Sequence, residues 1–436
     1  MKRFAVIVLS LMLTACAKVD ETHNIVSMES ESASVGVQIN QTSQNLETVT
    51  ERMDEQEDII ETTLMTKRLD EEDTADFFHS VTAESKGDDE SLAEHICYAD
   101  NAHVKVNGRE LYKDNIRYLG YSCSSVEFCF KGRYAEAELI PEPVESADGE
   151  NSYFSVTVNS EEVYNGILTE KKVLTLVDND VSEELCVKIT KLSEGCFGAI
   201  GIGYIKTVSD GEIVPAPKSD RMIEFIGDSL TCGYGVEASG ATERFSTSTE
   251  NGLKAYAALT AEQLGADYSI IGMNGIGIVS RYTPHGKKNT DGFLMPDLYQ
   301  YTDGFRSDEI WKSDYSPDIC VIALGANDNS YTGENPERKK EFSDGYIKFI
   351  GQVRKTNPNA YIICVSGIQR SNLADTISAS VDSYKLQTGD ENISFFRFVS
   401  QKDSEGYGSD YHPSAVSQKR FSEELYDYIK EVFPDF

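Results

Sequence analysis

The chain has 436 residues, of which 40% are hydrophobic, and its formal net charge at pH 7 is −33. This length allows two or three domains, and the apolar fraction is sufficient for at least one sizeable core. The excess of negative charge argues against nucleic-acid binding, because phosphate groups would be repelled. A soluble, exported protein fits this composition.

The N-terminus has the features of a targeting segment. Lys2 and Arg3 precede a short apolar stretch over residues 4–13, which is too short to span a bilayer as a mature helix. The Leu-Thr-Ala-Cys sequence that ends at Cys16 resembles the lipobox of bacterial lipoproteins. The resemblance implies a signal peptide over residues 1–15, lipid attached to the Cys16 thiol, and a membrane-anchored protein of the bacterial cell envelope, at the cell surface. An ordinary secretory signal is the alternative, and both readings predict export.

Residues 16–94 form an acidic segment. It carries 21 acidic and 5 basic side chains and contains no Trp, Tyr or Pro. Such a composition does not bury a core easily, so we predict a tether that is largely disordered or partly helical. A weak heptad-like spacing of apolar residues from Leu46 to Met65 leaves a partner-binding helix as the alternative.

Residues 95–216 have the pattern of a β-domain. Short apolar or alternating runs are separated by Asn, Asp, Gly and Glu. This spacing is typical of an all-β sandwich, and the segment 211–220, with its two prolines, is interpreted as the linker to the next domain. The strand candidates are 126–130, 153–158, 172–177, 185–189 and 199–202.

Residues 217–436 alternate between apolar strands and amphipathic stretches, which predicts an α/β domain with a parallel sheet covered on both faces. In such a sheet functional groups gather at the carboxyl ends of the strands. Strands are expected at 222–226, 268–272, 318–324, 360–366 and 393–398, and helices near 253–264, 342–355, 371–387 and 414–432.

Polar groups follow three of these strands. Ser229 follows the first strand, in the sequence Gly-Asp-Ser-Leu. Gly277 follows the second strand and Asn327 follows the third. Asp410 and His412 stand just before the last predicted helix. In isolation the Gly-Asp-Ser-Leu turn is equally compatible with a residue that only caps a helix.

Together these residues supply the groups needed for acyl transfer. Ser229 Oγ would attack an ester carbonyl while His412 removes its proton, and Asp410 would orient the imidazole. The amides of Ser229 and Gly277 and the side chain of Asn327 would bind the oxyanion, where one donor is worth about 3–4 kcal/mol. This chemistry needs no cofactor, no Cys/His spacing resembles a zinc site, and we therefore expect no metal.

The four ordered residues Ser229, Gly277, Asn327 and His412 resemble the blocks of the SGNH (GDSL-like) hydrolase superfamily. The run 227–235 and the sequences around Asn327 and His412 are most similar to carbohydrate esterase family 2, the acetyl xylan esterase type. Over residues 95–436 the resemblance implies a flavodoxin-like three-layer α/β/α hydrolase domain preceded by a jelly-roll-like β-sandwich. It also implies deacetylation of acetylated xylan or glucomannan, as polymer or oligosaccharide.

The third member of the triad departs from the usual pattern. Most of the superfamily places the acid three residues before the histidine, where this chain has Ser409. Asp410 lies two residues before His412, as in some members of the esterase family. The alternative is that Asp410 faces solvent and a backbone carbonyl orients the ring.

Other polar or aromatic residues near these motifs have less direct roles. We expect Asp328 to brace its loop by hydrogen bonding rather than to take part in catalysis. Trp311 and Tyr331 are either platforms for stacking on sugars or packing residues.

Nine cysteines occur in the chain, and export would permit disulfides. Cys123 with Cys129, and Cys186 with Cys196, are candidate pairs because they lie close in sequence.

The sequence is therefore compatible with three functions. The leading one is a serine esterase that removes O-acetyl groups from plant cell-wall polysaccharide. The same site could instead act on lipid, thioester or peptidoglycan O-acetyl groups. A third interpretation is a non-catalytic glycan-binding lipoprotein, which the presence of all four motif residues argues against.

Overall fold

The computed structural model describes residues 91–142, 150–312, 315–369 and 372–436. The predicted signal peptide, Cys16 and residues 16–90 of the predicted tether lie outside the described residues. None of the helices in the described part is both long and apolar enough to cross a lipid bilayer.

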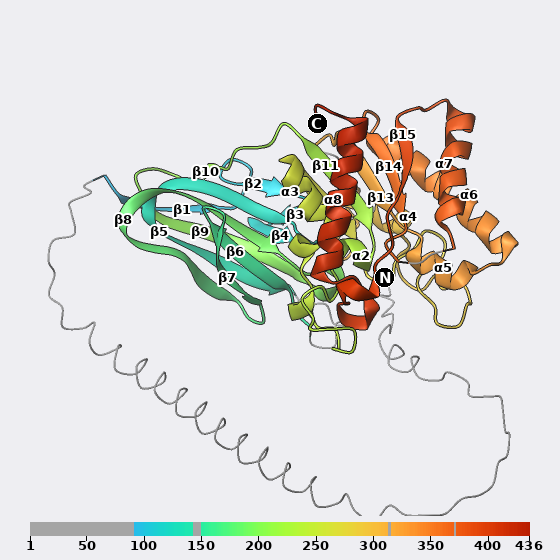
Figure 1. Ribbon diagram of the computed structural model, residues 1–436. Coiled ribbons are helices and arrows are strands. Elements are labelled where there is room, and N and C mark those ends of the chain that lie inside the picture. The colour runs from blue at the N-terminus through green and yellow to red at the C-terminus, as the bar shows by residue number, and fades with distance from the viewer. Residues whose placement is uncertain (1–90, 143–149, 313–314, 370–371) are drawn as a thin grey trace, which may run out of the picture. The chain divides into compact units, whose positions relative to one another are not determined.

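The first part of the described chain forms an antiparallel sheet, sheet A (Figure 1). Its main path runs β3-β4-β9-β5-β8-β6-β7, with β1 paired to β9 and with β2 and β10 paired to β5. The strands are β1 (Ala93–Tyr98), β2 (Lys105–Asn107), β3 (Glu110–Lys113), β4 (Ile116–Leu119), β5 (Ser125–Glu142), β6 (Tyr153–Val158), β7 (Glu161–Ile167), β8 (Lys172–Lys191), β9 (Ala199–Ser209) and β10 (Val214–Pro215).

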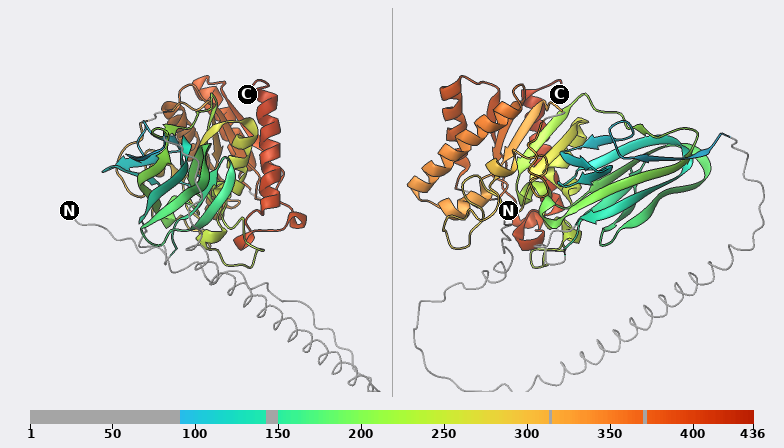
Figure 2. Two further views of the ribbon diagram at one scale, coloured as in Figure 1. Left: turned by 90° about the vertical axis from the view of Figure 1, so that its left-hand side faces the viewer. Right: turned by 180° about the vertical axis from the view of Figure 1, so that it is seen from behind.

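Two of these strands are much longer than the sequence pattern indicates. The predicted strands 172–177 and 185–189 are both part of β8, which has 20 residues and pairs with the 18-residue β5. The polar stretch between them stays in the sheet because β8 continues its pairing with β5 across an irregularity near Gly132. Such irregularities increase strand bending and twist, and sheet A is curled like a jelly roll (Figure 2).

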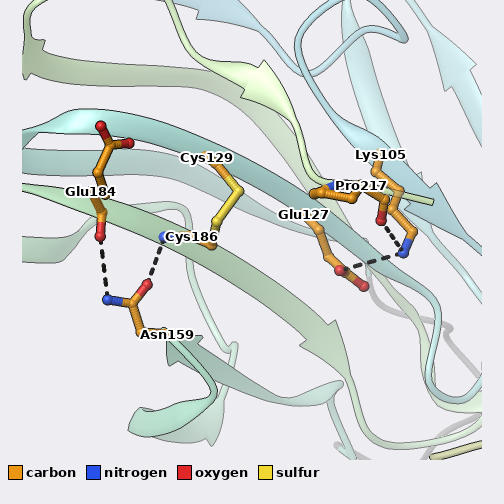
Figure 3. The surroundings of a disulfide bond; sticks show 7 residues. All are labelled: Lys105, Glu127, Cys129, Asn159, Glu184, Cys186 and Pro217. Carbon is orange, nitrogen blue, oxygen red and sulfur yellow. Dashed lines mark hydrogen bonds and ion pairs between the residues drawn. A yellow bond between two sulfur atoms is a disulfide. The ribbon is translucent and has the colours of Figure 1, made fainter. Parts of the chain in front are cut away.

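A disulfide joins Cys129 of β5 to Cys186 of β8, which are direct cross-strand partners (Figure 3). Both sequence-based candidate pairs are therefore wrong: Cys123 and Cys196 are free thiols. Proximity in sequence was the wrong criterion, because pairing between antiparallel strands places residues 57 positions apart side by side.

The rest of the described chain forms sheet B, which has five parallel strands in the order β12-β11-β13-β14-β15. This order reverses direction beside β11, and ligands bind at such a point in open α/β sheets. The strands are β11 (Met222–Gly227), β12 (Asp267–Gly272), β13 (Ile319–Ala323), β14 (Tyr361–Ser366) and β15 (Ile393–Arg397).

Helices cover both faces of sheet B (Figures 1 and 2). α6 and α7 pack on one face and α3 and α8 on the other, so that alternate residues of the central strands enter two separate apolar cores. The helices of this domain are α2 (Ser229–Cys232), α3 (Tyr256–Leu264), α4 (Met295–Leu298), α5 (Ala326–Thr332), α6 (Pro336–Thr356), α7 (Ala374–Thr388) and α8 (Ala415–Val432).

Candidate active site

Ser229 lies at the carboxyl end of β11 and is the first residue of α2. Asp228 caps this helix, because its side chain accepts a hydrogen bond from the Leu230 amide at 3.0 Å. Gly227 is required, since a Cβ there would lie 2.0 Å from a side-chain oxygen of the following turn. The tight turn holds the Ser229 side chain, which is 5% exposed, at the edge of sheet B.

The segment before α8 returns His412 to the same edge. Gln418 of α8 donates a hydrogen bond to the carbonyl of Leu230 at 2.9 Å, and the Ser409 amide donates to the carbonyl of Gly235 at 3.1 Å. Gly235 has a φ of 60°, and a Cβ there would lie 2.5 Å from that of Ser409. The glycine therefore permits the close approach that brings His412 to Ser229.

His412 and Ser229 are in direct contact. Nε2 of His412 lies 2.9 Å from Ser229 Oγ, and Nδ1 lies 3.1 Å from the carbonyl oxygen of Ser409. Because that carbonyl can only accept, we assign the ring proton to Nδ1, which leaves Nε2 free to accept a proton from the serine. Desolvation lowers the pKa of His412 to about 4, so the ring is neutral at neutral pH.

Asp410 does not take the position predicted for it. Its carboxylate accepts a hydrogen bond from the Tyr234 hydroxyl at 2.9 Å, whereas the Ser409 carbonyl faces Nδ1 of His412. The reason is local: residues 409–411 form a 3₁₀ turn that brings the Ser409 carbonyl back to the ring, and Asp410 is left-handed with a φ of 51°. The exposed carboxylate affects the ring only through its charge, which raises the pKa of His412 against the larger effect of desolvation.

The predicted oxyanion-binding groups gather at neighbouring strand ends. Asn327, near the start of α5, donates hydrogen bonds through Nδ2 to Asp228 at 3.1 Å and to the Ile276 carbonyl at 2.9 Å. The amides of Ser229 and Gly277 donate to no acceptor within the described ranges. Both amides are thus available for a ligand. Asn327 Nδ2 already donates to two acceptors, so it could bind an oxyanion only by sharing one of its hydrogens.

Asp328 braces the loop after β12, as predicted. Its buried carboxylate accepts hydrogen bonds from the amides of Ile278, Val279 and Ser280 at distances of 2.8–3.1 Å. Burial nevertheless raises the pKa of Asp328 to about 6, and it raises the pKa of Asp228 to about 7. Asp328, which follows β13, therefore holds the loop that carries Gly277 in place.

Two features of the site had no signal in the sequence. The Tyr234 ring lies over His412, with 4.3 Å between centroids, and stacks on Phe245 at 4.0 Å. Glu194, which belongs to the β-domain, accepts a hydrogen bond from the Asn274 amide after β12. Tyr234 falls within the predicted nucleophile motif, but nothing in its position along the chain indicates what it contacts.

Trp311 and Tyr331 take packing positions. The Trp311 ring lies against the buried guanidinium of Arg109, whose Cζ is 4.9 Å from the ring centroid. The Tyr331 hydroxyl donates a hydrogen bond to Glu341 at 2.8 Å. Arg338 covers the Tyr331 ring at 4.7 Å. These contacts favour the packing interpretation for both residues.

Residues 225–420 match the GDSL-like Lipase/Acylhydrolase family. This range contains Ser229, Gly277, Asn327 and His412. The α/β domain belongs to this family. This domain, called the GDSL-like domain below, has the SGNH hydrolase fold. Sheet A is consistent with the predicted jelly-roll-like domain, so the predicted fold class is confirmed.

The relatives of the chain extend over both domains. It is 30% identical over 341 residues to the Cellulase/esterase CelE of Acetivibrio thermocellus, covering 76% of this chain and 40% of that protein. It is 30% identical over 224 residues to the acetylxylan esterase / glucomannan deacetylase of Cellvibrio japonicus, covering 49% of this chain and 60% of that protein. The chain thus spans less than two thirds of the length of either curated relative.

A solved structure supports the same relationship. A family two carbohydrate esterase from Clostridium thermocellum, in complex with cellohexaose, superposes with a TM-score of 0.68 at 29% identity. The match covers 76% of this chain and 99% of that one. The similarity to family two carbohydrate esterases therefore includes the β-domain as well as the GDSL-like domain.

Proposed function

We propose that this protein is a serine esterase that removes O-acetyl groups from plant cell-wall polysaccharide, acetylated xylan or glucomannan. The observation that carries the proposal is the 2.9 Å contact between Ser229 Oγ and Nε2 of His412, whose Nδ1 is held by a backbone carbonyl. The names of the two curated relatives, an esterase and an acetylxylan esterase / glucomannan deacetylase, support the substrate class.

The reaction starts with attack by Ser229. Its Oγ adds to the acetyl carbonyl carbon while His412 Nε2 accepts the hydroxyl proton. The negative charge on the carbonyl oxygen is stabilised by the amides of Ser229 and Gly277, with Asn327 contributing as its hydrogens permit. The bond to the sugar oxygen then breaks, and the ring returns its proton to the departing sugar hydroxyl.

The acetyl–serine ester is hydrolysed in the second half of the cycle. Neutral His412 removes a proton from water, whose oxygen adds to the acetyl carbon. The bond from that carbon to Ser229 Oγ breaks, acetate leaves, and the proton held by the ring restores the serine hydroxyl. Desolvation favours this cycle, because a lowered His412 pKa keeps the base unprotonated between turnovers.

Exposed aromatic side chains near the site support a carbohydrate substrate. Tyr411, which directly precedes His412, is 55% exposed, and Tyr282 in the loop after β12 is 42% exposed. Aromatic faces with a polar edge suit surfaces that carry both C–H and hydroxyl groups, as sugars do.

The site is tested with a small aryl acetate. We expect Ser229→Ala to lower kcat by about 10⁴- to 10⁶-fold, because the nucleophile is lost while the oxyanion donors remain. Ser248→Ala, which removes an exposed hydroxyl that is hydrogen-bonded to Ser246, is the matched control and should retain wild-type activity. A wild-type protein that does not hydrolyse the ester but binds acetylated glycans would instead be a binding protein.

We further propose that the protein is exported as a lipoprotein of the bacterial cell surface. The sequence around Cys16 supports this, although it lies outside the described residues. Wild-type protein expressed in a bacterium should fractionate with membranes and incorporate labelled palmitate, whereas Cys16→Ser should do neither. Equal fractionation of the two proteins would argue for an ordinary secretory signal.

A further inference from the structure

Two carboxyl groups are buried together where the β-domain meets the GDSL-like domain. Glu194 follows β8 of sheet A, Glu250 belongs to the GDSL-like domain, and each is 0% exposed. The Glu194 amide donates a hydrogen bond to the Glu250 carboxyl group at 3.0 Å. Burying an acidic pair is costly, so a pair maintained across a domain boundary calls for an explanation.

Burial raises the pKa of both carboxyl groups, with desolvation as the largest cause in each case. Burial and the adjacent Glu194 raise the pKa of Glu250 well above its usual range, so Glu250 carries a proton. Lys191, also buried, donates to the Glu194 carbonyl at 2.9 Å, and its positive charge favours the ionised form of Glu194. Whether it is ionised or protonated, Glu194 keeps a carboxyl oxygen that can accept a hydrogen bond from a neighbouring donor.

That donor is the Asn274 amide. Asn274 lies in the loop after β12 that carries Gly277, residues 273–280, which we call the oxyanion loop. Asn274 and Gly275 are the central residues of a turn closed by a hydrogen bond from the Ile276 amide to the Met273 carbonyl. The Ile276 carbonyl in turn accepts from Asn327 Nδ2, and Gly277 follows directly. Glu194 is thus one turn away from two of the predicted oxyanion donors.

We propose that Glu194 is a positioning residue for ester hydrolysis, through which the β-domain holds the turn that presents the Gly277 amide to the oxyanion. The inference rests on the proposed esterase function. It assigns the β-domain a part in the GDSL-like site itself, in addition to any role in binding substrate. A glutamate side chain at this boundary, rather than a residue of sheet B, fixes one side of the oxyanion loop.

Removing the carboxylate should lower the rate of reaction without weakening substrate binding. We expect Glu194→Ala to reduce kcat on the aryl acetate about 10- to 100-fold. A displaced Gly277 amide would lose part of the oxyanion stabilisation that removing the donor would lose entirely. KM should change less than about 2-fold, since the donor acts mainly in the transition state. Glu194→Gln keeps an acceptor for the Asn274 amide and should restore kcat to within about 3-fold of wild type.

Glu150 provides a matched control. It also precedes a strand of the β-domain and accepts from a backbone amide of the GDSL-like domain, that of Thr247, at 2.8 Å. Thr247 lies outside the oxyanion loop, so Glu150→Ala should leave kcat unchanged. If Glu194→Ala does not fold, Glu194→Asp provides the same test, because its shorter side chain keeps the carboxyl group but not the reach to Asn274.

The two hypotheses fail in different ways. A wild-type protein without esterase activity would overturn the proposed function. An active wild type whose Glu194→Ala or Glu194→Asp variant has the same kcat as Glu150→Ala would overturn only the positioning role. A kcat loss that Glu194→Gln does not restore would also contradict it, because the loss would then not depend on an acceptor for the Asn274 amide.

Discussion

At the scale of single residues, the contact between the Ser409 carbonyl and His412 Nδ1 determines what Asp410 can do. Asp410→Asn preserves an acceptor for the Tyr234 hydroxyl and leaves the Ser409 carbonyl in place. We therefore expect it to lower kcat less than about 10-fold, whereas replacing the orienting acid of a serine triad costs about 10⁴-fold. Steady-state kinetics on the aryl acetate distinguish these two magnitudes. A loss of kcat of about 10⁴-fold would show that Asp410 is the orienting acid after all.

The protonation state of His412 is a second prediction at this scale. Because desolvation lowers the folded-state pKa of His412 to about 4, the ring should stay neutral from neutral pH down to about pH 5. The catalytic base is then present throughout that range and is lost only as pH falls through the lowered pKa. Nuclear magnetic resonance of ¹³C-labelled histidine, assigned with His412→Gln, measures this directly. A midpoint near 6.5 would show that the ring is not desolvated.

At the scale of elements, the disulfide between β5 and β8 stabilises the longest strand pair of sheet A (Figure 3). Cys129→Ala with Cys186→Ala should lower the free energy of unfolding by about 2–4 kcal/mol, because the bond closes a loop of 57 residues. Urea unfolding measures the change. Reduction with dithiothreitol should destabilise the wild type and have no effect on the double variant; equal sensitivity of the two proteins would exclude the bond.

The elements of the GDSL-like domain are more predictable from sequence than those of the β-domain. All five strands of sheet B and the cores of α3, α6, α7 and α8 fall within a few residues of their predicted positions, because buried parallel strands are continuous apolar runs. The short helices α4 and α5 were missed. The length of β8 was not predicted either, since the polar residues near 180 resemble a turn, whereas the strand pairs with β5 up to Asp178 and again from Glu183.

At the scale of the whole molecule, a buried ion pair links the β-domain to the first strand of sheet B. Arg109 and Glu224 are both fully buried, with 3.4 Å between them, and Arg109 also donates to the carbonyls of Tyr299 and Tyr301. Arg109→Ala would leave Glu224 without its counter-charge, so we expect a loss of about 3–5 kcal/mol in the free energy of unfolding.

The matched control for this prediction is Lys131→Ala. Lys131 pairs with Asp210 at 3.7 Å in an exposed position, and such pairs contribute about 0–1 kcal/mol. Urea unfolding of both variants gives the comparison. If the two substitutions cost the same, the boundary between the domains does not depend on the buried pair.

The candidate site was predictable where its residues belong to local motifs. Ser229 and His412 are brought together as the strand-end pattern predicts, and Gly277 and Asn327 lie at the adjacent strand ends. The partners supplied by the fold were less predictable: a backbone carbonyl was one of two alternatives for orienting His412, but no side-chain signal identified that of Ser409. Glu194 lies in a different domain, about 80 residues before the amide it contacts. Charged residues outside a motif are usually solvated, so nothing in the sequence distinguished it.

An esterase that acts on acetyl groups of plant polysaccharide should release free acetate from that polysaccharide, and the release should depend on Ser229. Wild type and Ser229→Ala are each incubated with acetylated xylan, acetylated glucomannan and O-acetylated peptidoglycan, and free acetate is quantified. We predict release from xylan or glucomannan by the wild type alone. Release only from peptidoglycan, or equal release by wild type and Ser229→Ala, would show that the protein is not a Ser229-dependent esterase of plant polysaccharide.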